Sequence, residues 1–104
     1  AVSLPGKFAK LEVGKAIDTG LHTFLFSDNL TIDEEIELKE RARERGLLVM
    51  GPGCGTAILN GVGLGFANVL DRGPVGMIAA SGTGLQEVSC LINNAGIGIS
   101  HAIG

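Results

Sequence analysis

Short apolar segments alternate along this chain with segments whose apolar residues recur at helical spacing, and this alternation constrains the fold more than any other feature. Helical periodicity covers three segments, Phe8 to Thr19, Ile32 to Arg45 and Ser81 to Ala95. Apolar runs lie between and after them, at residues 22–26, 47–50, 74–80 and 97–103. Strands that alternate with helices through short connections predict an α/β fold of βαβ units with a parallel sheet, and the near-continuous apolar strands favour a sheet covered on both faces.

The segment from Ile32 to Arg45 carries the clearest helix signals. Thr31 and Glu34 have the spacing of a capping box, in which each side chain accepts a hydrogen bond from the other residue's backbone amide. Acidic residues cluster at the start of this segment and arginines at its end, as the helix dipole favours, and Gly46 follows as a stop.

Charged residues are concentrated in the first half of the chain. Of the 19 charged side chains (8 Lys and Arg plus 11 Asp and Glu), 16 lie in residues 1–50, whereas residues 51–104 hold three of them together with 13 of the 17 glycines. A free-standing domain carries charge on about 25% of its residues, so three charges cannot coat half of one. We expect a partner or further sequence to cover the second half, and the isolated chain to expose apolar surface along residues 57–70 and 97–104 and to self-associate.

The composition argues against several classes of function. A pI near 5.2 and the lack of a basic stripe argue against nucleic-acid binding, which depends on neutralising phosphates. The charge-free run from Gly46 to Leu70 is interrupted by Pro52 and seven glycines, so it does not predict a membrane span. Cys54 and Cys90 have no metal-ligand spacing and are too few for a secreted disulfide scaffold, so we expect no metal and a cytoplasmic, reducing setting.

The strongest local signal of a binding site is the turn that follows the apolar run at residues 74–80. Ser81, Gly82 and Thr83 open a helix there, and the bare amides and dipole of a helix N-terminus attract an anion such as phosphate. Ligands of α/β proteins also gather at the carboxyl ends of strands. The alternative is an ordinary Ser or Thr N-cap. The turn is neither a P-loop nor a G-x-G-x-x-G motif.

A second glycine-rich loop, from Gly51 to Thr56, also follows a strand. Its glycines suit either close approach of the backbone to a ligand or a tight crossover. Cys54 in this loop would need a nearby base to act as a nucleophile, but the spacing of His22 and His101 supports no such pair. A small buried thiol and hydrogen-bonded structural histidines are the simpler interpretations, so we assign no catalytic residue.

Three stretches of the chain resemble, in the same order, the α subunit of succinyl-CoA synthetase. They are residues 16–20 (Ala-Ile-Asp-Thr-Gly), 51–55 (Gly-Pro-Gly-Cys-Gly) and 75–83 (Val-Gly-Met-Ile-Ala-Ala-Ser-Gly-Thr). Five stretches are similar to FdrA-type proteins, a branch of the acyl-CoA synthetase superfamily, at residues 26–29, 47–52, 54–58, 65–69 and 80–87. Together these motifs extend over nearly the whole chain.

The resemblance implies a division into domains. In this family a Rossmann-like CoA-binding domain precedes flavodoxin-like domains. Residues 1–30 are therefore expected to be the C-terminal piece of the CoA-binding domain, and residues 31–104 the incomplete start of a flavodoxin-like ligase domain.

The resemblance also implies a reaction and its site. The family passes an acyl phosphate and a phosphohistidine between nucleotide, acid and CoA, which implies CoA, ATP or another nucleotide, and phosphate as cofactors. Ser81, Gly82 and Thr83 then correspond to the helix N-terminus that holds the phosphate of the phosphohistidine. The residues implied in CoA binding are Ser27, Asp28 and Cys54. Gly53 departs from the pattern, because the ligases have Asn at that position.

By the same resemblance, the chain is expected to be a fragment of a CoA–acid ligase. The glycine-rich CoA loop would lie before residue 1 and the phosphorylated histidine after residue 104, so the fragment alone is expected to be inactive. Its implied partners are the missing parts of its own chain or a β-type subunit, a small-molecule acid substrate, and further copies in a homo-oligomer. The alternatives are an oxamate carbamoyltransferase subunit of allantoin degradation and a non-catalytic anion-binding or scaffolding module.

Overall fold

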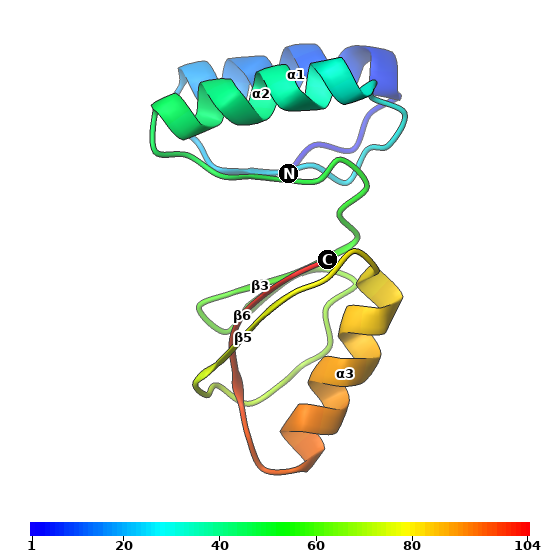
Figure 1. Ribbon diagram of the computed structural model, residues 1–104, viewed down its shortest axis with the longest axis vertical. Helices are drawn as coiled ribbons and strands as arrows, with labels where there is room; N and C mark the ends of the chain where they lie inside the picture. Colours follow the sequence, from blue (N-terminus) through cyan, green and yellow to red (C-terminus); the bar gives the residue numbers. More distant parts are fainter. The chain divides into compact units, whose positions relative to one another are not determined.

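The chain forms two compact α/β units, and the computed structural model describes all 104 residues. Unit 1 spans Ala1–Cys54 and unit 2 spans Gly55–Gly104. Figure 1 shows the helices and strands of each unit. Each unit contains a pair of parallel strands, so the predicted α/β class is confirmed.

In unit 1, two helices lie over one face of a small parallel sheet (Figure 1). The elements are α1 (Gly6–Asp18), β1 (Thr23–Phe24), α2 (Ile32–Glu44) and β2 (Val49–Met50). Thr23 pairs with Val49 in parallel register, and Val2 forms a parallel bridge to Leu25. The strands are shorter than the apolar runs that predict them, whereas the helices begin and end close to the predicted residues.

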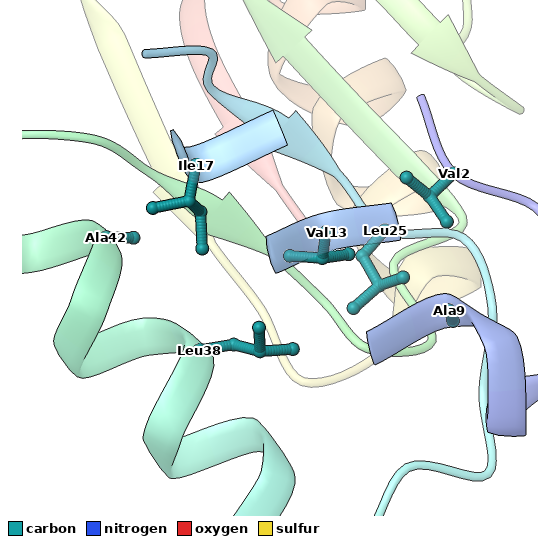
Figure 2. Packing of buried hydrophobic residues seen from close by; sticks show 7 residues of the cluster. All are labelled: Val2, Ala9, Val13, Ile17, Leu25, Leu38 and Ala42. Atoms are coloured by element: carbon teal, nitrogen blue, oxygen red, sulfur yellow. The ribbon is translucent and has the colours of Figure 1, made fainter. Parts of the chain in front are cut away.

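The core of unit 1 lies between this sheet and its helices. Ala9, Val13 and Ile17 are fully buried, four residues apart, so they share one face of α1 as the helical period requires. Leu38 and Ala42 have the same relation on α2. Figure 2 shows these side chains converging with those of the strand segments, and the buried cluster consists of Val2, Ala9, Val13, Ile17, Leu25, Leu38 and Ala42.

The expected capping box at the start of α2 is present. The Thr31 hydroxyl accepts a hydrogen bond from the Glu34 amide at 3.2 Å, and the Glu34 carboxylate accepts one from the Thr31 amide at 2.9 Å. These two bonds satisfy amides that the first turn of a helix otherwise leaves without a partner. Thr31 therefore fixes where α2 begins.

Unit 2 is a four-stranded mixed sheet with one helix. Its elements are β3 (Thr56–Leu59), β4 (Val62–Gly65), β5 (Val75–Ile78), α3 (Gly82–Asn94) and β6 (Ile99–Ile103). The strand order is β4-β3-β6-β5, in which β5 and β6 are parallel and β3 is antiparallel to both β4 and β6. The sequence predicts β5, α3 and β6 but not β3 and β4, and the antiparallel pairing of β3 makes the sheet of this unit mixed.

The turn between β3 and β4 explains why this part of the chain is a hairpin. Asn60 and Gly61 have φ values of 52° and 80°, as the two central residues of a type I′ turn require. Asn-Gly is the sequence that tolerates these angles best, and such a turn matches the twist of the two strands that it joins. The alternating glycines after it obscure this signal.

One face of the unit 2 sheet is covered by a helix and the other is not (Figure 1). Ile58, Ile99 and Ala102 are buried with Leu85 of α3. By contrast, the Ile78 side chain is 91% exposed, and the exposed large apolar side chains of residues 57–70 are Val62, Phe66 and Val69. The expected apolar exposure is thus present at residues 62–69 and at Ile97, whereas Ile99 and Ala102 are buried.

The two compact units divide between Cys54 and Gly55. α2 and β2 share one core with α1 and β1, so residues 31–54 belong physically with residues 1–30. The assignment of residues 1–30 and 31–104 to two family domains stays a prediction.

Candidate functional site

The predicted phosphate-binding turn joins β5 to α3. Ser81 is the N-cap of α3: its hydroxyl accepts a hydrogen bond from the Gly84 amide at 3.1 Å, and its carbonyl accepts one from the Leu85 amide at 2.9 Å. The Ser81 and Thr83 hydroxyls lie 3.3 Å apart. The N-cap interpretation of Ser81 is therefore correct, and its hydroxyl is already engaged within the turn.

Two amides of this first turn remain for a ligand. Gly82 and Thr83 occupy the first two helical positions, whose N–H groups have no acceptor within a helix. These groups point out of the N-terminus, where the dipole of the 13-residue helix adds partial positive charge. An anion at this position would meet two amides and the Thr83 hydroxyl rather than the Ser81 hydroxyl.

The structure brings Thr56, from the second glycine-rich loop, next to this turn. A Cβ atom added to Gly82 would lie 3.5 Å from the Thr56 hydroxyl and 3.6 Å from the Gly104 carbonyl oxygen. Thr56 and Gly104 bond to each other twice, with N···O distances of 3.2 and 2.9 Å. The start of β3 and the chain just after β6 therefore form one wall beside the N-terminus of α3, a contact that sequence spacing alone does not reveal.

Phe66 lies on the same side of unit 2. Its amide donates to the Gly55 carbonyl at 2.9 Å, and its own carbonyl accepts a hydrogen bond from the Gln86 side chain in the second turn of α3. The ring is 65% exposed. An accessible aromatic side chain thus stands close to the loop that borders the N-terminus of α3.

The residues predicted to bind CoA belong to unit 1, on two loops that follow parallel strands. The Gly53 amide donates to the Ser27 carbonyl at 2.9 Å, so the loops after β1 and β2 are directly joined. The buried Ser27 hydroxyl accepts from the Leu4 amide at 2.7 Å, and it therefore anchors the N-terminal segment. Asp28 is exposed and bonds to the Asn29 side chain at 2.6 Å, while Cys54 is buried. Their role in CoA binding stays a prediction.

Both histidines have structural contacts. His22 accepts a hydrogen bond at Nδ1 from the Leu48 amide at 3.0 Å, and His101 accepts one at Nδ1 from the Asn60 amide at 3.1 Å. His22 lies at the amino end of β1, whereas Cys54 follows the carboxyl end of β2, so these two residues do not form a nucleophile–base pair. The assignment of no catalytic residue stays a prediction.

Comparison with known proteins finds several relatives, although no protein-family model matches the chain. It is 48% identical over 103 residues to the uncharacterized protein YahF of Escherichia coli (strain K12), covering 99% of this chain and 20% of YahF. It is 29% identical over 108 residues to SauD, an ADP-forming sulfoacetate-CoA ligase subunit of Bilophila wadsworthia, covering 97% of this chain and 37% of SauD. It is 26% identical over 106 residues to the α subunit of the ADP-forming succinate–CoA ligase of Methanothermobacter thermautotrophicus, covering 99% of this chain and 36% of that subunit.

A solved structure shares the fold. The dinucleotide-forming acetyl-coenzyme A synthetase 1 of Ca. Korarchaeum cryptofilum superposes with a TM-score of 0.73 at 21% identity, over 99% of this chain and 24% of the synthetase chain. The fold is thus one found in acyl-CoA synthetases, as predicted.

Together these comparisons show that the chain is similar in sequence to subunits of ADP-forming CoA ligases and shares its fold with part of an acetyl-coenzyme A synthetase. The chain spans between about a fifth and somewhat over a third of the length of the curated relatives described above. Membership of the FdrA-type branch stays a prediction. No helix of the chain is both long and apolar enough to cross a membrane.

Proposed function

We propose that this chain is the part of an acyl-CoA synthetase in which the N-terminus of α3 holds a phosphate during ligation of an acid to CoA. The observation that carries the proposal is the pair of first-turn amides of Gly82 and Thr83, directly after a parallel strand. The relationship to ligase subunits supplies the chemistry, because such enzymes activate an acid before thioester formation. The phosphate would be that of an acyl phosphate or a phosphohistidine formed in the complete protein.

The proposal assigns the remaining cofactors to other parts of the protein. CoA would bind near the joined loops that carry Ser27, Asp28 and Cys54, and a nucleotide such as ATP would be the phosphate source. Several relatives are named as subunits of ligases, which supports a partner chain of the β type for this protein as well.

The test removes one amide without breaking the helix. Proline is tolerated at the first helical position, where the N–H has no intrahelical acceptor, and the preceding Ser81 already has the extended backbone (φ −124°, ψ 117°) that a residue before proline needs. Gly82→Pro should therefore delete a phosphate donor and keep α3. Gly82→Ala is the matched control, because it adds a Cβ at ordinary contact distance and keeps the amide.

The measurement is a titration of each protein with inorganic phosphate, followed by the amide resonances of Thr83 and Gly84 in NMR spectra. Wild type and Gly82→Ala should shift at millimolar phosphate, and Gly82→Pro should need a several-fold higher concentration, as expected for loss of one charge-assisted hydrogen bond. Identical titrations of all three proteins, or no shift in the wild type, would contradict the phosphate site.

The parent reaction is tested on the full-length protein. Ligase activity is measured as CoA thioester formation with ATP, acid and CoA, and carbamoyl transfer as carbamoyl phosphate formation from oxamate derivatives. Activity only in the second assay would refute the ligase assignment while leaving the phosphate site intact.

A further inference from the structure

The hairpin turn at Asn60 and Gly61 has a chemically labile sequence, and its residues also make several polar contacts. An asparagine side chain that precedes glycine is readily attacked by the next backbone nitrogen, because glycine has no side chain to obstruct the approach. Asn60 is the only one of the five asparagines that glycine follows. Its side chain is exposed, so burial away from water does not protect it.

Three contacts hold the reacting groups apart. The nucleophile is the Gly61 nitrogen, and its N–H donates to the Ser100 carbonyl at 3.1 Å. The electrophile is the Asn60 side-chain amide, whose oxygen accepts a hydrogen bond from the Arg72 guanidinium. The Asn60 backbone amide is fixed in turn by Nδ1 of His101 at 3.1 Å.

Arg72 also restrains the turn sterically. Its alkyl stem lies over Gly61, so that a Cβ atom built on Gly61 would meet the Arg72 Cγ at 2.6 Å. Attack on the side chain requires the Gly61 nitrogen to leave Ser100 and the Asn60 side chain to rotate away from Arg72. Both movements oppose contacts that the folded hairpin makes.

We propose that Asn60 is a site of spontaneous deamidation, that the folded hairpin slows this reaction, and that the contacts with Arg72 contribute to the protection. In the reaction the Gly61 nitrogen gives its proton to solvent base and forms a bond to Cγ of Asn60. The bond from Cγ to the side-chain nitrogen breaks, and ammonia leaves. Water then opens the resulting succinimide at one of its two carbonyls, which yields aspartate or isoaspartate without any oxidant or reductant.

The two products have different consequences for unit 2. Aspartate at position 60 keeps an oxygen acceptor for Arg72 and leaves the backbone length unchanged. Isoaspartate inserts one extra carbon into the main chain, so Gly61 can no longer keep both its place in the turn and its bond to Ser100. Strand register in a hairpin is set by its turn, and β4 is therefore expected to lose its pairing with β3.

The experiment follows conversion of Asn60 in the intact chain by peptide mass mapping during incubation in mildly alkaline buffer. Four samples are compared: native wild type, wild type in concentrated urea, Arg72→Met and Arg45→Met. Arg72→Met keeps the alkyl stem and loses the donor, whereas Arg45→Met makes the same change of charge in unit 1. The other four asparagines, none of which precedes glycine, are internal controls.

Native wild type and Arg45→Met should convert slowly and urea-treated wild type fast. Arg72→Met should convert about threefold to tenfold faster than native wild type, as loss of one hydrogen bond predicts. Equal rates in native and urea-treated wild type would overturn the proposal, as would equal rates in folded Arg72→Met and Arg45→Met. If circular dichroism shows that Arg72→Met is unfolded, Arg72→Lys, which keeps a donor, must convert at the slow rate for the proposal to stand.

Discussion

Thr23 shows how a single buried polar atom can be at odds with the fold around it. Its side chain is 2% exposed, and its hydroxyl has no hydrogen-bond partner. Because side chains alternate along a strand, Thr23 lies on the same side of the chain as Leu25, which belongs to the apolar core of unit 1. Burial of an unsatisfied hydroxyl costs free energy that an apolar side chain of the same shape avoids.

Thr23→Val should therefore raise the free energy of unfolding by about 1 kcal/mol, measured by urea denaturation. Val keeps the branched shape and removes only the hydroxyl. Thr23→Ala is the control: it also removes the hydroxyl but leaves a cavity, so it should gain less or be destabilising. A stability loss in Thr23→Val would show that the hydroxyl finds a partner in solution.

At this scale the sequence predicts local chemistry well and distant contacts poorly. The sequence predicts Ser81 as an N-cap or an anion ligand. Capping depends only on residues within one helical turn, and the hydrogen bond from the Gly84 amide to the Ser81 hydroxyl is such a local contact. The approach of Thr56 to Gly82 depends on how β3 joins the sheet, which no local pattern specifies. The same holds for the hydrogen bond between Gly53 and Ser27, because these residues lie on two loops that are far apart in sequence.

Among the elements, α1 and α2 are joined across their exposed side by charged pairs. Lys10 bonds to Glu37 at 2.7 Å, and Arg41 bonds to Asp18 at 3.0 Å. Arg41 reaches across α1 because Gly14 has no side chain: a Cβ there would lie 3.3 Å from its guanidinium. The hydrogen bond from Lys10 lowers the pKa of the Glu37 carboxyl and raises the pKa of the Lys10 ammonium.

These shifts predict a dependence of stability on pH. Since the Glu37 pKa is lowered on folding, its contribution is present above the ordinary value of 4.5 and is lost as the pH falls through the lowered folded value. When the pH is lowered across this range, the urea concentration at the midpoint of unfolding should fall more for the wild type than for Glu37→Gln. The effect should be small and should shrink at high salt, because both side chains are solvent-exposed.

A control for this comparison is Glu44→Gln, which removes a carboxylate of α2 that has no ion pair in the structure. It should follow the acid response of the wild type. If Glu37→Gln and Glu44→Gln behave alike, the Lys10–Glu37 pair does not contribute in solution.

The three helices were predictable from sequence because their signals lie within the helix and its caps. The hairpin of β3 and β4 was missed, although Asn60-Gly61 is a strong turn signal. Positions 61, 63 and 65, which alternate along the turn and β4, are all glycines, so the usual alternation of apolar and polar residues is absent. Without that alternation, glycine content favours the prediction of a loop.

At the scale of the molecule, unit 2 presents an apolar sheet face without a helix over it. Ile78 pairs with Ile103, so these two residues share a face of the sheet, on which Ile78 is exposed and Ile103 is half-buried. Met77, Ala102 and Ile58 lie on the opposite face, against α3. The charge asymmetry of the sequence thus corresponds to a surface that in water favours contact with another apolar surface.

We expect the isolated chain to self-associate through this face, and Ile78→Lys to reduce the association without unfolding the unit. Ile78 is 91% exposed, so the substitution removes little buried contact. Sedimentation velocity at several protein concentrations measures the effect, and Asn94→Lys, at the exposed end of α3, is the control for charge. A wild-type chain that remains a monomer at all concentrations would contradict the prediction.

The two bonds between Thr56 and Gly104 have a mechanical meaning for unit 2. Thr56 at the start of β3 and Gly104 just after β6 lie at neighbouring points of the sheet, where β3 and β6 run in opposite directions. Force or displacement applied at both points acts across a pair of hydrogen bonds rather than along the length of the sheet.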